Sequence, residues 1–146
     1  MAVRRNVTQT ATAVAASYTV TLGAHQTGDL LLVPLTQQGG ATTIAPDATA
    51  TTAGWQILAQ ARASTVVRLA LAWKIAASSS EPNPTFTGTN DDWVGSCIVI
   101  QDAHATPFGS IVSGTDYTIT TYSAATSYTA PALTSAADGC LLMWFT

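Results

Sequence analysis

A strict alternation of apolar and other side chains runs from Val66 to Ile75 and is the clearest structural signal in the chain. One set of alternate positions is apolar throughout and consists of Val67, Leu69, Leu71, Trp73 and Ile75. The intervening set consists of Arg68, Ala70, Ala72 and Lys74. Because successive side chains of a β-strand point to opposite faces, this period of two predicts a strand. We expect the apolar set to face the core, with Arg68 and Lys74 facing solvent.

Several shorter segments share this strand-like pattern and are separated by turn-forming residues. They are Tyr18–Leu22, Leu30–Leu35, Trp55–Ala63, Thr85–Thr87, Trp93–Gln101, Tyr117–Tyr122 and Cys140–Phe145. Pro34 predicts a bulge or an edge in the second of these, because proline has no N–H to donate to a neighbouring strand. No segment has the period of an amphipathic helix, and we interpret the stretch from Gln38 to Gly54 as a long Ala/Thr loop. Short strands at this spacing predict an all-β chain, an antiparallel β-sandwich of jelly-roll or immunoglobulin-like type.

The segment Ala16–Thr36 recurs without a gap as Thr126–Thr146, at a constant offset of 110 residues. Both copies carry Ser-Tyr-Thr, then a Gly/Asp pair, then an apolar run. That offset is about one domain length. We therefore expect an extended N-terminal arm at residues 1–15, a β-sandwich domain at 16–125, and a final hairpin or the start of a second, similar sandwich at 126–146. The apolar run at the end favours a polypeptide that continues further.

The composition narrows the classes of function. Charged residues make up 9% of the chain, against about 25% in ordinary globular proteins, while hydrophobic residues reach 47%. The resulting neutral surface suits a subunit of an assembly better than a free enzyme. The net charge is −3 and Lys74 is the single lysine, so the basic patch that nucleic-acid binding requires is missing. Polar residues interrupt every long apolar run, so we expect neither a membrane span nor a secretion signal.

The residues that carry chemistry are few and do not form a recognisable catalytic set. Asp102 and His104 lie two apart, but neither Ser96 nor Ser110 is in a nucleophile elbow or beside a glycine-rich oxyanion loop. His25 and His104 are the histidines of the chain, and no zinc-binding spacing joins them to a carboxylate. We therefore expect no catalytic centre, no cofactor and no bound metal.

Acidic residues beside a tryptophan make one candidate ligand site. Asn90, Asp91 and Asp92, together with Asp116, supply oxygen ligands for calcium, but their spacing does not match a calcium loop, and we interpret them as a solvated turn. The other tryptophans belong to apolar faces by alternation. Trp93, with Asp91 and Asp92, is therefore a candidate glycan-contact site.

Two arginines, Arg4 and Arg5, stand near the start of an otherwise uncharged N-terminal arm. Such an arm is either disordered or lies along a neighbouring subunit, where guanidinium groups make bidentate hydrogen bonds to carboxylates. We keep Arg4 and Arg5 as candidate partner-binding residues.

Six short motifs follow one another along the chain. They are Gly28–Leu32, Gly39-Gly40, Ala53–Trp55, Leu69–Ala76, Ser80–Pro82 and Phe86–Gly88, and a second Asp-Gly-x-Leu-Leu start follows at Asp138. In this order and spacing they resemble β-sandwich modules in the virion structural proteins of tailed bacteriophages. The likeness covers residues 16–146. It implies a non-enzymatic virion component that is assembled in the host cytoplasm.

The resemblance also implies partners. They are the major capsid protein or other virion subunits, with the chain forming a homo-oligomer in the particle. We favour a capsid-decorating or minor head protein held by its arm and a sheet edge, because one sandwich follows a short arm without a coiled-coil or collagen-like shaft. The alternative is a tail-associated or fibre module that binds a receptor or a carbohydrate. We expect no nucleic acid and no membrane among the partners.

Overall fold

The computed structural model describes residues 3–11, 14–39, 42–63, 66–101, 103 and 107, with the backbone alone for 3–11 and 63. This part of the chain holds eight strands and one short helix. The elements are β1 (Val3–Ala11), β2 (Ala15–Thr19), β3 (Leu30–Gln38), β4 (Ala45–Pro46), α1 (Ala48–Thr52), β5 (Gln56–Ala63), β6 (Val67–Ile75), β7 (Thr85–Asp91) and β8 (Trp93–Gln101).

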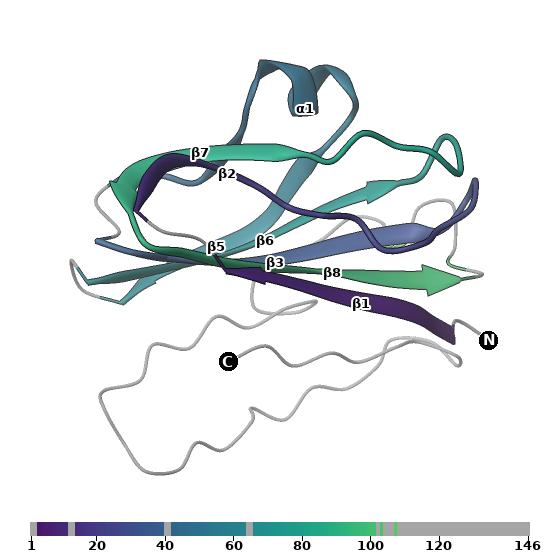
Figure 1. The fold of residues 1–146 in the computed structure, drawn as a ribbon, viewed down its shortest axis with the longest axis horizontal. Helices are drawn as coiled ribbons and strands as arrows, with labels where there is room; N and C mark the ends of the chain where they lie inside the picture. Colours follow the sequence, from purple (N-terminus) through teal and green to yellow (C-terminus); the bar gives the residue numbers. More distant parts are fainter. Residues whose placement is uncertain are drawn as a thin grey trace, which may run out of the picture.

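The strands form two antiparallel sheets that pack against each other (Figure 1). One sheet has the order β1-β8-β3-β6-β5 and the other the order β2-β7-β4. Three pairs are nested along the chain, β1 with β8, β2 with β7 and β3 with β6. Nested antiparallel pairs divided between two sheets are the arrangement of a jelly roll. The predicted all-β sandwich is confirmed, and its topology is the jelly-roll alternative, with β5 added beside β6.

Four aromatic side chains occupy the core between the sheets. Tyr18 of β2 stacks on Trp93 of β8, with ring centroids 5.8 Å apart and ring planes 8° apart. Trp55 meets Phe86 edge to face at 6.1 Å. Gly95 leaves room for the tyrosine, since a Cβ at this position would lie 2.6 Å from Tyr18 Cε1. Aromatic pairs of this kind contribute about 0.5–1.5 kcal/mol beyond the apolar area they bury.

β6 has the predicted alternation, but its two faces are the reverse of those we expected. Lys74 is buried, at 7% exposure, on the inner face with Ala70 and Ala72, whereas Trp73 is half-buried on the outer face. A second apolar cluster covers that outer face and includes Leu30, Leu32, Leu71, Trp73, Ile75, Ile98 and Ile100. The face that carries Ala70 and Ala72 points inward because these small side chains leave room for the aromatic residues of the core.

Two local features also differ from the sequence interpretation. The expected Ala/Thr loop contains α1, which Asp47 caps by accepting a hydrogen bond of 2.7 Å from the Ala50 N–H. Pro34 lies in the central strand β3, in continuous register with β6, and not at an edge or bulge. The pairing of β3 with β8 passes over Val33 and Pro34 without a change of register, which accommodates the missing N–H.

The N-terminal segment is a strand of the same sandwich. β1 pairs with β8 from Val3, opposite Gln101, to Ala11, opposite Val94. This corrects the expectation of an N-terminal arm separate from the sandwich, because residues 3–11 pair within their own chain. Main-chain pairing requires no particular side chain, so the open edge of β8 accepts this polar segment within its own chain.

The first copy of the internal repeat joins the two sheets. Ala16–Thr36 covers most of β2, in the three-stranded sheet, and most of β3, in the centre of the five-stranded sheet. The first copy is therefore a crossover between layers and not a hairpin. The second copy, residues 126–146, lies outside the described residues.

Candidate functional site

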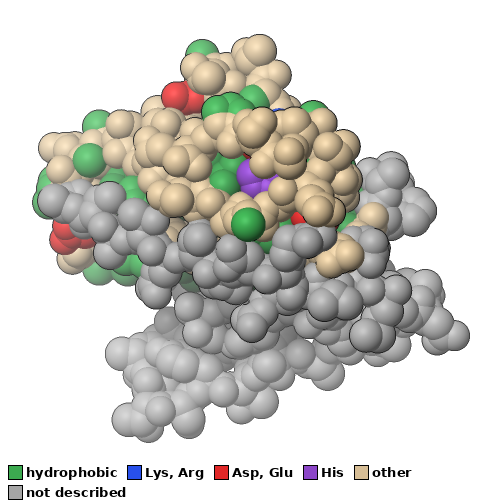
Figure 2. Space-filling model, turned by 45° about the vertical axis from the view of Figure 1, so that its right-hand side comes forward, with side chains coloured by type: hydrophobic (Ala, Val, Ile, Leu, Met, Phe, Trp, Pro, Cys, Tyr) green, Lys and Arg blue, Asp and Glu red, His purple; other side chains and the backbone are tan. Residues whose placement is uncertain are grey.

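The two ends of the five-stranded sheet carry different side chains. The polar end, where β6 finishes and β3 begins, is defined here by His25, Lys74 and Glu81. The apolar end, where β3 finishes and β6 and β8 begin, is defined here by Val14, Val66, Leu69 and Val94. Figure 2 shows the face that exposes a histidine, and most of its coloured surface is uncharged side chain or backbone.

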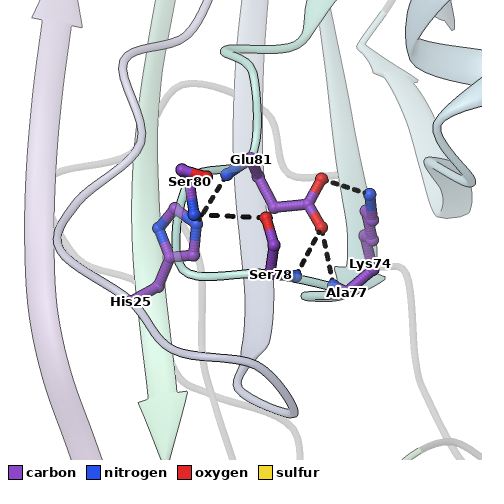
Figure 3. Close-up of polar contacts among 6 residues, drawn as sticks. All are labelled: His25, Lys74, Ala77, Ser78, Ser80 and Glu81. Carbon is purple, nitrogen blue, oxygen red and sulfur yellow. Dashed lines mark hydrogen bonds and ion pairs between the residues drawn. The ribbon is translucent and has the colours of Figure 1, made fainter.

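A buried ion pair ties the end of β6 to the loop that follows it (Figure 3). The Lys74 Nζ lies 2.5 Å from Glu81 Oε2, and the two side chains are 8% and 5% exposed. These residues are the single lysine and the single glutamate of the chain. Glu81 Oε1 accepts hydrogen bonds from the backbone N–H groups of Ala77, at 2.6 Å, and Ser78, at 3.2 Å. Both carboxylate oxygens are therefore engaged.

His25 connects this loop to the segment that precedes β3. Its Nε2 accepts a hydrogen bond of 3.2 Å from the backbone N–H of Glu81, and its Nδ1 lies 2.7 Å from the carbonyl oxygen of Gly23. These partners assign the neutral ring with the proton on Nδ1. Ser78 and Ser80 lie close by in Figure 3, yet both ring nitrogens are engaged by backbone groups. The arrangement fastens two loops and does not pair a base with a serine nucleophile.

The electrostatics of Glu81 also favour a structural role. Burial raises the pKa of this carboxyl, but the Lys74 ammonium and the Ala77 and Ser78 N–H groups outweigh burial and hold the pKa below its ordinary value of 4.5. A general base works best with a pKa near the operating pH. A carboxylate with a lowered pKa and two engaged oxygens is suited to holding a loop. Sequence reasoning missed this cluster, although it noted Lys74 and the motif that contains Glu81.

A depression of about 150 Å³ lies between α1 and the start of β7, next in sequence to Glu81. Its lining consists of Asp47, Thr49, Ala50, Ala53, Trp55, Pro82, Asn83, Pro84 and Thr85. The Asp47 N–H donates to the Thr85 carbonyl at 2.9 Å, and the Leu22 N–H donates to Asn83 Oδ1 at 2.9 Å. Because these bonds tie the lining to the strands, the depression is a preformed part of the fold.

Trp93 is not the exposed tryptophan that the candidate glycan-contact site required. It is 0% exposed, stacks on Tyr18, and donates from Nε1 to the Ala15 carbonyl at 2.7 Å. Asp91 and Asp92 lie at the turn before it, where the Asp92 N–H donates to Asp91 Oδ1 at 2.8 Å. The expectation of an exposed Trp93 was therefore wrong, because the acidic residues mark a turn while the next residue already begins a core strand.

The other residues singled out by the sequence fall into two groups. Arg4 pairs with Ile100 in the backbone ladder and Arg5 lies at a shift of register, while their side chains are outside the description. Their role in partner binding stays a prediction. Asp102, His104 and Ser110 lie outside the described residues.

Cys97 is a buried, free cysteine on the inner face of β8. Burial raises the pKa of its thiol, and the hydrogen bond from the Gly23 backbone opposes that shift only in part. A thiol kept in its protonated form is unreactive. Cys97 is therefore a packing residue of the core.

Four large apolar side chains are exposed at the apolar end. The exposed fractions are 58% for Val14, 55% for Val66, 42% for Val94 and 40% for Leu69. Leu69 and Val94 both pair with Thr36, so they flank one central residue in a row across the outer face. Adjacent strands lie about 4.8 Å apart, which places these two side chains roughly 10 Å from each other. Exposed apolar side chains in one row of a sheet, such as Leu69 and Val94, make that part of the outer face a candidate interaction surface.

Within the described ranges, no three His, Cys, Asp or Glu side chains gather as a metal site. No helix in that same part of the chain is long and apolar enough to cross a membrane. Comparison of the chain with protein-family models, with curated proteins and with solved structures finds no match.

Proposed function

We propose that this chain is a non-enzymatic structural module of a tailed-bacteriophage particle, a capsid-decorating or minor head protein. In this proposal it contacts the major capsid protein or other virion subunits through the apolar end of its jelly roll. The observation that carries the proposal is the exposure of Val14, Val66, Leu69 and Val94 on a chain with very few charges.

The positions of the resembling motifs support a role in architecture. Lys74 belongs to the motif Leu69–Ala76, Glu81 belongs to the motif Ser80–Pro82, and the two meet in the buried ion pair. The motif Ala53–Trp55 ends α1 and supplies a core tryptophan, with Gly54 at a φ of 92° that favours glycine. These motifs therefore serve the fold, as is expected of a recurring module that does no chemistry.

The surface supports the same role. Interfaces between proteins are depleted in charged residues at their centres, and contiguous apolar patches on a monomer mark sites of interaction. A free enzyme gains solubility from a charged surface, which this chain lacks. The N-terminal strand β1 lies at the edge of the described sheet and offers a further main-chain contact to a neighbouring subunit.

Quantitative mass spectrometry of separated heads and tails tests the proposal. We expect the chain in purified heads at a fixed ratio to the major capsid protein. The double variant Leu69→Ser and Val94→Ser should fold normally by circular dichroism and be incorporated at a ratio reduced roughly tenfold or more, which corresponds to about 1.4 kcal/mol of lost binding. Gln56→Ser, an exposed change away from the apolar end, is the matched control and should be incorporated normally.

Three results would overturn all or part of the proposal. Absence of the chain from particles would remove the structural role altogether. Its presence in tails alone would replace the head location by the alternative role in a tail or fibre. Full incorporation of the double variant would show that the apolar end is not the contact surface.

A further inference from the structure

We propose that the depression between α1 and β7 binds one ring of a neutral saccharide, an activity that goes beyond the proposed role in assembly. The site lies at the polar end of the sandwich, away from the apolar contact surface. Its volume of about 150 Å³ is smaller than the roughly 300–1,000 Å³ of pockets that enclose drug-sized ligands. The space suits a single ring at the end of a glycan and not an enclosed chain.

The polar lining groups offer both an acceptor and a donor. Asp47 uses Oδ1 to cap α1, which leaves its second carboxylate oxygen for an outside donor. Asn83 uses its Oδ1 to accept from Leu22, which directs the amide N–H groups elsewhere as donors. The exposed Thr49 adds a hydroxyl that acts in either sense.

This combination selects hydroxyl groups among the small ligands. Neighbouring hydroxyls of a sugar ring donate to a carboxylate and accept from an amide at the same time. An ammonium or guanidinium ion only donates and a metal ion accepts only lone pairs, so neither forms a hydrogen bond with the Asn83 amide N–H groups. An anion only accepts, so it meets the Asp47 carboxylate unfavourably.

The remaining lining is apolar and suits the C–H edges of a sugar ring. Pro82 and Pro84 stand on one side, and Ala53 stands on the α1 side. Trp55 is 3% exposed and braced by Phe86, so it supports the floor of the depression and does not offer a free ring face. Recognition therefore rests on the hydrogen-bonding groups and the prolines.

The lining is held in place before any ligand binds. The Val20 N–H donates to the Pro84 carbonyl at 3.0 Å, and the Thr51 N–H donates to the Asp47 carbonyl at 2.8 Å. Pro46 of β4 pairs with Phe86 of β7, which joins the two sides of the depression. A preformed site loses little conformational entropy on binding, which favours a small ligand with few contacts.

Titrations followed by ¹⁵N NMR of the full chain test the proposal. The probes are D-glucose, D-galactose and N-acetyl-D-glucosamine, each added separately to millimolar concentration. We expect at least one of them to shift the Trp55 indole and Asn83 side-chain amide signals in a saturable way. Asp47→Asn retains the helix cap, because asparagine caps as well as aspartate, and should weaken that binding roughly tenfold. Asp92→Asn, at the opposite end of the sandwich, is the matched control and should bind as the parent chain does.

Three outcomes would overturn the saccharide site. The first is the absence of a saturable shift with all three sugars. The second is equal affinity of Asp47→Asn and the parent chain. The third is a shift caused by methylguanidinium chloride and by none of the sugars, which would make the depression a cation site. None of these readouts depends on particles, so they leave the proposed structural role untouched.

Discussion

The polar end and the apolar end of this jelly roll use their side chains in opposite ways. At the polar end, the single lysine and the single glutamate of the chain are buried together, and backbone N–H groups also donate to the glutamate. At the apolar end, Trp93 is buried between the sheets, while Val14, Val66, Leu69 and Val94 remain exposed. The comparison teaches that this chain buries a charged pair at one end, where it holds a loop, and exposes apolar side chains at the other end, beside the exposed charges of Arg62 and Asp92.

The hydrogen bonds to the buried ion pair contribute more to its stability than the attraction between its charges does. Taking two charges out of water costs several kcal/mol for each ion, and mutual attraction alone rarely offsets this. Here Glu81 also receives two backbone N–H groups, so the loop after β6 closes around a fully engaged carboxylate. The pair therefore specifies one conformation of the loop.

Replacing Trp93, the buried tryptophan at the start of β8, should have the largest effect on stability. Trp93→Ala removes the stack on Tyr18 and the hydrogen bond to Ala15, and should lower the free energy of unfolding by about 3–5 kcal/mol. Trp73→Ala, on the outer face, should cost clearly less because Trp73 is only half-buried. Urea denaturation of both variants measures the difference. A greater loss from Trp73→Ala would contradict the assignment of the faces.

Breaking the ion pair should come next. Lys74→Met leaves the Glu81 carboxylate buried beside an apolar group and should cost about 3 kcal/mol, at the low end for broken buried pairs, because two N–H groups still hold the carboxylate. Adding Glu81→Gln should restore part of the loss, since it removes the uncompensated charge. Denaturation of the single and double variants gives the coupling. Additive losses would show that the two residues do not act as a pair.

Acid should weaken the polar end selectively. The folded-state pKa of Glu81 lies below its ordinary 4.5, so its contribution to stability is present above that value and is lost as the pH falls through the lower, folded-state pKa. Hydrogen exchange of the Ala77 and Ser78 amides, corrected for the intrinsic effect of pH, should report this loosening. Glu81→Gln should remove the acid dependence. The same dependence in that variant would assign it to another group.

Removing exposed apolar side chains should change stability least. Leu69→Ser and Val94→Ser should each lower the free energy of unfolding by about 1 kcal/mol, because both side chains are already partly in water. Thermal unfolding measures this directly. A loss of more than about 2 kcal/mol for either variant would show that the side chain is buried in the core. The apolar end would then lack the exposed apolar side chains that distinguish it from the polar end.

Sequence reasoning predicted the strands well and the environments of several side chains poorly. The alternation of Val66–Ile75 predicts β6, and the spacing of short strands predicts the sandwich, because both depend on local periodicity. Trp93 was misjudged because its acidic neighbours belong to a turn that ends at the strand. The Lys74–Glu81 pair was missed because the two residues lie on different elements, and no local pattern shows which of them meet.

The sequence by itself determined the class of the fold, since alternating apolar positions, turn residues and the lack of helical periodicity all favour short antiparallel strands. It also determined which residues of β6 share a face. Only the tertiary structure decided which face is inside, because a period of two is the same from both sides, and space beside Tyr18, Trp55, Phe86 and Trp93 selects the alanines. Tertiary structure likewise decided that β1 belongs to the sheet, since pairing through the backbone leaves no signature in the side chains.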